Sequence, residues 1–169
     1  MFLSASNYTT EEVIKLTGLE RHHLAYYKKL NLFPPTGDET VLLHSKSNGK
    51  RRKYSTLDVL VLQAVAELKS KGMPFLRIRR VIEYLQQHHK LEKPFHAALD
   101  GRHNVSILTD GVKDFYICYN DHDVVEHLRG GGQYLFLDVS DVAFDLREKL
   151  KALQVYRRKL EDRKFKKAA

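Results

Sequence analysis

The sequence predicts an α+β fold in three parts: short N-terminal helices with a basic hairpin, a small αβ module with about three strands, and a long C-terminal helix. Three observations lead to this prediction. Apolar residues recur at helical spacing through the first 88 residues, β-branched and aromatic residues gather in three short runs between 105 and 137, and leucines repeat every three or four residues after 141.

Length and composition set the limits. The chain has 169 residues, the size of one ordinary domain or two small ones, and 43% of them are hydrophobic, enough to bury a core. No apolar run approaches the ~18 residues of a membrane span, and the N-terminus lacks the pattern of a secretory signal. The single cysteine, Cys118, excludes an intrachain disulfide and a thiolate zinc cage built by one chain. We therefore expect a cytoplasmic protein without a membrane segment.

Charge is distributed unevenly along the chain. The formal net charge of +8 divides into +7 for residues 1–94, −6 for 95–145 and +7 for 146–169. A basic N-terminal region favours a polyanionic partner, whereas nucleic acid would repel the acidic middle. The division predicts a DNA-facing part, an acidic part that serves assembly or a ligand, and a basic C-terminal end.

Two short helices joined by a glycine turn are predicted first. Thr9 or Thr10 would cap a helix over about 11–16, and Gly18 would allow a tight turn into a second helix over about 20–30. The inward stripe of the second helix would consist of Leu24, Tyr27 and Leu30. This arrangement is typical of a helix-turn-helix motif.

A basic hairpin, here called the wing, is predicted over residues 36–54. A short strand over 41–44, an Asn-Gly turn at 48–49 and a return strand over 50–54 suit a type I′ hairpin. Lys50, Arg51, Arg52 and Lys53 precede Tyr54 on the return strand. Because side chains alternate along a strand, about half of these charges face any one surface, where they suit a phosphate backbone.

The remaining elements follow from caps and periodicity. Ser55 and Asp58 form a capping-box pattern before a helix over about 56–71, a further helix covers about 74–88, and residues 89–104 form a link. The αβ module combines strands over 105–108, 115–119 and 133–137 with a short helix over 121–129. Asp141 would cap the final helix. The expected domains are thus 1–88, the linker 89–104, and 105–169.

Several short segments, in the order in which they occur along the chain, resemble those of a known protein family. They are Tyr8-Thr-Thr-Glu-Glu-Val, Leu16-Thr-Gly-Leu19, Leu24-Ala-Tyr-Tyr27, Leu32-Phe-Pro-Pro35, Arg52-Lys-Tyr-Ser55 and Phe75-Leu-Arg-Ile78, with the 57–72 helix between the last two. From Tyr8 to about Leu85 the chain resembles the MerR-type winged helix-turn-helix transcription regulators.

The resemblance implies a homodimer that binds double-stranded DNA at a two-fold operator. It implies that the second helix enters the major groove and that the wing lies on the phosphate backbone, which points to His22, His23, Tyr26, Tyr27, Arg52 and Tyr54; the charge pattern adds Lys50 and Arg51. The sequence departs from the family at Ala25, where arginine is usual, and at Asn31, where glycine is usual. Structural alternatives stay open: Tyr27 as a core residue, and His22 and His23 as solvated side chains.

The final helix carries a leucine seam formed by Leu146, Leu150, Leu153 and Leu160, which Arg157 interrupts. The spacing is that of a coiled coil and predicts dimerisation; the alternative is that the seam packs on the chain's own sheet. The basic residues beyond the seam form either a solvated helix end or a secondary nucleic-acid contact.

Catalytic and metal-binding patterns are not recognisable in the sequence. His122 and His127 are five residues apart, which does not align them on one helix face, and we expect Cys118 to be a packing residue. We therefore predict no enzyme activity, metal or cofactor. The predicted function is a nucleoid-associated, sequence-specific DNA-binding regulator. The alternative is a protein-binding adaptor or antitoxin-like module whose C-terminal half captures a partner protein, and an unknown effector at that half also stays open.

Overall fold

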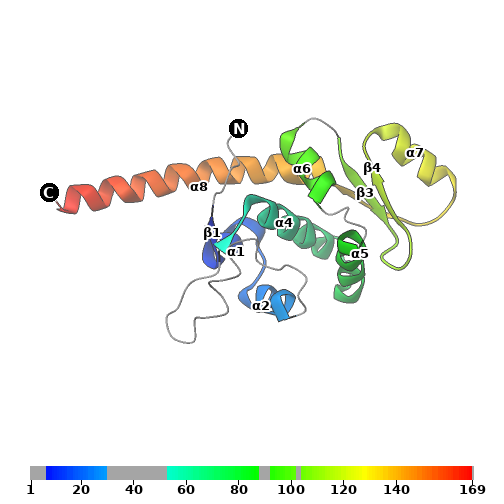
Figure 1. Cartoon of the computed structure of the whole chain (residues 1–169), viewed down its shortest axis with the longest axis horizontal. Helices are drawn as coiled ribbons and strands as arrows, with labels where there is room; N and C mark the ends of the chain where they lie inside the picture. Colours follow the sequence, from blue (N-terminus) through cyan, green and yellow to red (C-terminus); the bar gives the residue numbers. More distant parts are fainter. Residues whose placement is uncertain (1–6, 30–52, 88–91, 102–103, 169) are drawn as a thin grey trace.

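A computed structural model of the chain describes residues 7–29, 53–87, 92–101 and 104–168 (Figure 1). Its elements follow the predicted order of helices, small sheet and long final helix. They are β1 (Tyr8–Thr9), α1 (Thr10–Thr17), α2 (Arg21–Lys29), β2 (Lys53–Tyr54), α4 (Thr56–Ser70), α5 (Phe75–Gln87), α6 (Glu92–Asp100), β3 (Ser106–Thr109), β4 (Phe115–Cys118), α7 (Asp121–Arg129), β5 (Leu135–Asp138) and α8 (Val139–Ala168).

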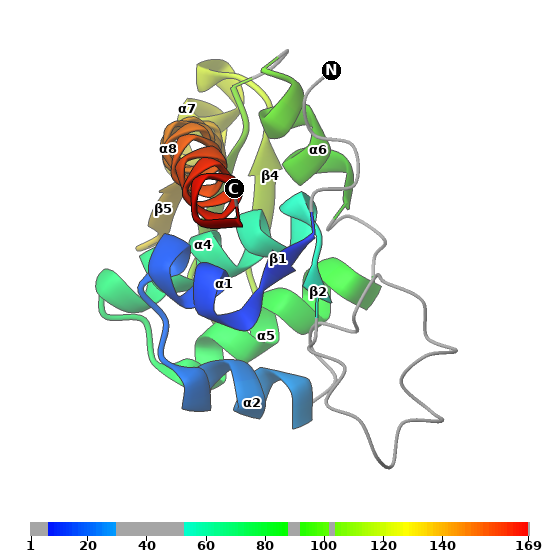
Figure 2. The same ribbon diagram turned by 90° about the vertical axis from the view of Figure 1, so that its left-hand side faces the viewer.

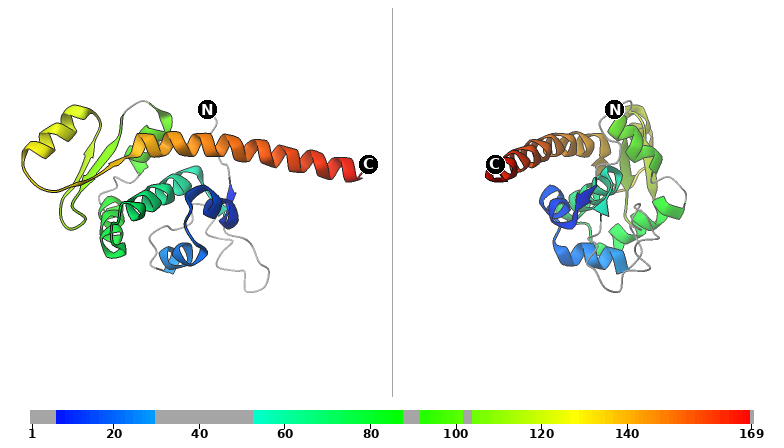
Figure 3. Two further views of the ribbon diagram at one scale, coloured as in Figure 1. Left: turned by 180° about the vertical axis from the view of Figure 1, so that it is seen from behind. Right: turned by 60° about the vertical axis from the view of Figure 1, so that its left-hand side comes forward.

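The helix α8 runs along one side of the molecule and extends beyond the rest of it (Figures 1 and 3). The helix α2 lies on the opposite side, with α1 and α4 between it and α8 (Figures 1 and 2). The three-stranded sheet and α7 lie at the end of the molecule that holds the N-terminus of α8. The chain therefore separates the outer surface of α2 from both the sheet and α8.

The first two helices form as the caps predicted. The Thr9 side chain accepts the Glu12 N–H while the Glu12 carboxylate accepts the Thr9 N–H, which closes a capping box at the start of α1. Gly18 ends α1 at φ 72°, a left-handed conformation that suits glycine. The Thr17 hydroxyl donates to the Val13 carbonyl and accepts the Leu19 N–H, so the turn between α1 and α2 is hydrogen-bonded inside the fold.

A continuous hydrophobic core holds the N-terminal helices, the sheet and α8 together. The helix α4 lies at its centre and packs against α1, α5, α6 and α8. The predicted Ser55–Asp58 capping box is present at its start. Among the described helices, all except α7 contribute buried residues to this core.

The sheet has the order β4-β3-β5, and both pairs are antiparallel. The face that carries Ile107 and Leu137 packs on the main core. The opposite face carries Leu108 and Cys118, which are buried but stand outside that core. The helix α7 packs on β4, and its His127 ring stacks on Tyr116. The predicted strands and the helix over 121–129 are thus confirmed, with strand ends shifted by one or two residues.

Residues 92–100 correct the prediction of a link. They form α6, whose Phe95, Ala98 and Leu99 are buried in the core beside α4 and α8. Pro94 lies in the first turn, where a helix tolerates proline because the missing N–H would have no intrahelical partner. Few inward positions mark this short helix, and in the sequence they are too weak a pattern to distinguish it from a loop.

The start of α8 also differs from the prediction. The helix begins at Val139, and the Asp138 carboxylate accepts the N–H of Asp141, so Asp138 and not Asp141 occupies the capping position. Leu146 and Leu150 are buried in the chain's own core, against the region of α4 and α6. The first half of the leucine seam therefore packs within the chain, and these two residues are not available for dimerisation.

Candidate nucleic-acid interface

The outer face of α2 is set by the residues that α2 buries. Leu24 and Tyr27 point into the core, and both are at most 3% exposed. The opposite side of this nine-residue helix carries an exposed stripe at the spacing i, i+3, i+4, i+7. It consists of His22, Ala25, Tyr26 and Lys29.

Tyr26 is exposed and supported at the same time. Its side chain is 44% exposed, and its ring meets the edge of Phe75 from α5 at 4.8 Å between centroids. Phe75 also stacks on Tyr27 at 5.6 Å. Such aromatic contacts hold the Tyr26 ring in place and leave its outer side open to a ligand.

His22 and His23 have different environments. The Nδ1 of His23 accepts the Glu20 N–H, and its Nε2 lies 2.9 Å from the ammonium of Lys69. Burial, followed by the charge of Lys69, lowers the pKa of His23, which keeps the ring neutral. His22 is exposed, its ring is tilted against that of His23 with centroids 4.0 Å apart, and its Nδ1 lies 3.1 Å from a carboxylate oxygen of Glu20. Of the two predicted histidines, His22 has the surface for an outside contact, whereas His23 closes the first turn of α2.

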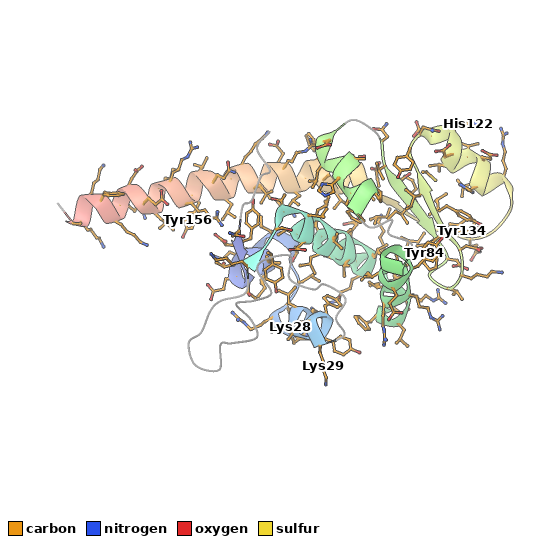
Figure 4. All side chains as sticks on the ribbon, in the orientation of Figure 1. Lys28, Lys29, Tyr84, His122, Tyr134 and Tyr156 are labelled. Carbon is orange, nitrogen blue, oxygen red and sulfur yellow. The ribbon has the colours of Figure 1, made fainter. Side chains whose placement is uncertain are left out.

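Exposed cations surround the outer face of α2. Lys28 and Lys29 lie at its C-terminal end, and Lys29 points away from the rest of the molecule (Figure 4). The interaction with His23 places Lys69, at the end of α4, beside the start of α2. Our sequence interpretation missed these lysines. The sequence did contain a sign of Lys29. It follows Tyr26 by three positions and His22 by seven, which places all three on the same face of a helix.

Two predicted contact residues are corrected. Tyr27 is 2% exposed and Tyr54 is 4% exposed, and both belong to the hydrophobic core. Tyr54 lies in β2, where it pairs with Tyr8 of β1. Burial leaves these rings almost no surface for DNA, so their role is packing, which was the open alternative for Tyr27.

Of the four predicted cations of the wing, one lies within the described residues. Lys50, Arg51 and Arg52, together with the strand at 41–44 and the turn at 48–49, lie outside the described residues. Lys53 is described and exposed, and it pairs with Thr9 in the antiparallel β1–β2 ladder. The described end of the predicted return strand, Lys53–Tyr54, therefore pairs with β1, which leads into α1.

Polar bonds connect α8 to both ends of α1. Arg157 donates to both oxygens of Glu12, at 2.8 and 2.6 Å, and its guanidinium lies 5.3 Å from the centre of the Tyr8 ring. The Lys149 ammonium donates to the carbonyl of Leu16 at 3.1 Å. The hydrogen bond from Arg157 lowers the pKa of Glu12 against the opposing effect of burial. The residue that interrupts the leucine seam, Arg157, thus binds α1 of its own chain.

The rest of the predicted seam is more open. Leu153 is half-buried against the core, and Leu160 is 36% exposed. Tyr156, which was not predicted, is 54% exposed on the neighbouring side of α8 (Figure 4).

Metal or redox chemistry finds no support in the described residues. Within 7–29, 53–87, 92–101 and 104–168, no three His, Cys, Asp or Glu side chains come together in a way that would hold a metal ion. Burial, and then the charge of Asp123, raises the pKa of the Cys118 thiol, which disfavours the reactive thiolate. None of the helices described is long and apolar enough to cross a bilayer.

Comparisons with known proteins match the N-terminal part of the chain to a family. Residues 8–85 match the model of the MerR HTH family regulatory proteins. Proteins named uncharacterized HTH-type transcriptional regulators, from Mycobacterium bovis and Mycobacterium tuberculosis, are 24% identical to the chain over 139 residues. The alignment covers 82% of this chain and 55% of each relative, so the chain spans about half the length of the curated relatives it matches.

Proposed function

Residues 8–85 are a MerR-type helix-turn-helix domain, and on this premise we propose that the chain is a sequence-specific, homodimeric regulator of transcription rather than an enzyme. The observation that carries the proposal is the outer face of α2. A nine-residue helix with an aromatic ring and cations on its exposed side has the size and chemistry to enter a major groove. The two-fold symmetry of a dimer would match a two-fold operator at the nucleoid.

The outer face divides into two kinds of contact. Lys29, Lys28 and Lys69 would neutralise phosphates, which supplies affinity without sequence preference. Tyr26 and His22 would face the base edges, where hydrogen bonds and apolar contacts carry sequence preference. Ala25, in the place of the family's usual arginine, adds no charge to this face.

Footprinting on genomic fragments, with band shifts at several salt concentrations, tests the proposal. We expect a defined footprint of two half-sites. Lys29→Ala should reduce the slope of log affinity against log salt by about one, and Tyr26→Ala should cost ~1–3 kcal/mol of discrimination between sites. Lys151→Ala, an exposed lysine on α8 away from α2, is the matched control. Sequence-blind binding by the wild-type chain, or equal effects of Lys29→Ala and Lys151→Ala, would contradict the proposal.

The wing is proposed as a second set of phosphate contacts, with Lys50, Arg51 and Arg52 in this role. A more basic wing would compensate for the arginine replaced by Ala25. Arg51→Ala combined with Arg52→Ala should weaken operator binding and lower the salt slope by about two. Unchanged operator affinity at physiological salt would remove the wing from the interface while leaving the role of α2 intact.

The homodimer is proposed to form through a face of α8 beside the predicted seam. This exposed stripe follows helical spacing and consists of Asp145, Lys149, Ala152, Tyr156, Leu160, Arg163 and Lys167. Its positions are symmetric about Tyr156. In an antiparallel pair, Ala152 of one copy would lie opposite Leu160 of the other, and Asp145 opposite Lys167. Lys149 would lie opposite Arg163 of the other copy, which carries the same charge. The Lys149 ammonium, however, donates to the Leu16 carbonyl of its own chain and so points away from that arginine.

Sedimentation of the full chain tests this arrangement. Tyr156→Glu would place two like charges at the centre of the pair and should convert the dimer to monomer. Lys167→Glu should weaken the dimer, and adding Asp145→Lys should restore it, because the swap exchanges the charges at both ends. A dimer unaffected by Tyr156→Glu would refute this face while leaving DNA binding to be judged separately.

The adaptor alternative makes different predictions in the same experiments. It requires a stoichiometric complex with another protein and only weak, sequence-independent DNA binding. A footprint with a steep salt dependence therefore separates the two functions.

A further inference from the structure

A cleft lies where the N-terminal domain meets the sheet. Its volume is about 610 Å³, within the range of about 300–1,000 Å³ typical of small-molecule sites. Three segments line it: the turn between α4 and α5, the turn between β3 and β4, and the residues that enter β5. An occupant would contact both the DNA-binding part and the sheet.

The cleft has apolar surface on both sides. Met73 and Pro74 line it from the α4–α5 turn, and Leu135 and Phe136 line it from β5. Phe136 is 43% exposed although it lies in a strand. Tyr134 lies beside the β3–β4 hairpin, and its hydroxyl is 3.4 Å from a carboxylate oxygen of Asp114 (Figure 4). Flat rings next to aliphatic groups suit a ligand with an apolar, planar body.

Arg77 supplies a positioned positive charge at the cleft. A Cβ added at Gly111 would lie 2.9 Å from the Cβ and Cδ of Arg77, so the arginine stem packs directly on the glycine backbone. Gly111 has φ 71°, which also favours glycine there. No ion pair of Arg77 exists with any described residue, whereas Lys71, the other cation of the lining, lies 3.5 Å from Glu67.

Asp110 is the acidic residue of the lining, but it is already engaged. Its Oδ1 accepts three backbone N–H groups, from Val112, Lys113 and Asp114, at 2.8–3.0 Å. This carboxylate holds the β3–β4 turn together. The cleft thus combines a guanidinium that has no ion pair with any described residue and an apolar wall, which favours an anionic ligand over a cationic one.

The geometry points to a binding site for a small organic anion, a carboxylate or sulfonate with a flat apolar body, between Arg77 and the Tyr134–Phe136 wall. The guanidinium would bind the acidic group in the two-pronged manner that arginine favours. The ring system would lie against Phe136 and Met73. This site is separate from the outer face of α2 and does not depend on DNA binding.

A matched pair of fluorescent probes tests the site. The anion 8-anilinonaphthalene-1-sulfonate and the neutral N-phenyl-1-naphthylamine share the same ring body and differ in the sulfonate. We expect the full chain to bind the sulfonate with one site per chain, and to bind it more tightly than the neutral probe. Arg77→Met should weaken sulfonate binding roughly tenfold, the equivalent of one charge-assisted hydrogen bond, and leave the neutral probe unchanged.

Arg80→Met is the control, because Arg80 is exposed on the same helix but does not line the cleft. Phe136→Ser should weaken both probes, since it removes the apolar wall. Thermal melting of each variant shows that it remains folded. Equal losses in Arg77→Met and Arg80→Met, a sulfonate affinity insensitive to Arg77→Met, or an Arg77→Met defect confined to DNA binding would overturn the inference.

Discussion

The two halves of α8 share one helix and one leucine spacing, yet they meet different surroundings. Val139, Val142, Ala143, Leu146 and Leu150 are buried in the chain's own core. Beyond Leu153, by contrast, Tyr156 and Leu160 are exposed, and that part of the helix extends past the body (Figure 1). A periodic apolar stripe therefore shows that a helix buries one side, but not whether its partner is the same chain or another.

Arg157 marks the change between the two halves. It occupies a position where the seam would place an apolar residue, and it binds Glu12 across 145 residues of sequence. Folding and association can be tested separately, because substitutions at the buried Leu146 and Leu150 should affect folding, whereas those at the exposed Tyr156 should affect association.

The largest effect is expected at Leu146. Leu146→Ala removes a fully buried side chain and should lower the free energy of unfolding by ~2–5 kcal/mol. Leu160→Ala, at an exposed position of the same helix, should change it by less than ~1 kcal/mol. Urea unfolding, at a protein concentration where both variants sediment as monomers, measures the difference. If the two variants lost similar amounts of unfolding free energy, the two halves of α8 would not differ in how much they contribute to the fold.

The Glu12–Arg157 pair should have a smaller effect. Both side chains are partly exposed, so solvent screening reduces the value of their two hydrogen bonds, and Arg157→Met should cost ~1 kcal/mol. A double-mutant cycle with Glu12→Gln isolates the interaction from the loss of packing on Tyr8. Strict additivity of the two substitutions would mean that the pair contributes nothing to stability.

The same pair predicts a dependence on pH. The pKa of Glu12 is lower in the folded chain than in the unfolded chain, so in acid the unfolded state binds the extra proton. The stabilisation is complete above the unfolded value of about 4.3 and is lost as the pH falls through the folded value. We expect the difference in unfolding free energy between wild type and Glu12→Gln to shrink toward zero below that range. A difference that stays constant with pH would exclude Glu12 as its source.

The smallest effect is expected at the exposed Lys151–Glu148 pair, which precedes Arg157 on the same helix. Although the two charged atoms are 2.7 Å apart, both side chains are largely in solvent. Lys151→Ala should change stability by no more than ~0.5 kcal/mol at 0.15 M salt. If Lys151→Ala lowered the free energy of unfolding as much as Arg157→Met, an ion pair on α8 would stabilise the fold equally well without contacting α1.

Local signals in the sequence predicted much of the fold. The capping residues Thr9 and Ser55, the turn at Gly18 and the helix over 121–129 depend on neighbours within a few positions, and all are confirmed. The N-terminal family was also identified correctly from short motifs. In contrast, α6 went unrecognised because its inward residues gain their meaning only from α4 and α8.

The candidate site was harder to predict. The family resemblance pointed to both Tyr26 and Tyr27 as contacts, whereas the helical spacing placed Tyr27 on the inward stripe with Leu24, and the structure follows the spacing. Leu146 and Leu160 belong to one predicted seam, yet Leu146 is buried and Leu160 is exposed. The predicted roles of Lys50, Arg51 and Arg52 stay predictions, because these residues lie outside the described part of the chain.

The bonds from Arg157 and Lys149 to α1 have a consequence for operator choice. They fix α1, and with it α2, to a helix that rises by about 1.5 Å per residue. If two copies join through α8, the distance between their recognition helices is fixed by the protein and has to match the spacing of the half-sites on the DNA. We therefore expect the protein to distinguish operators by the distance between their half-sites as well as by their bases, because α8 sets the distance between the two recognition helices.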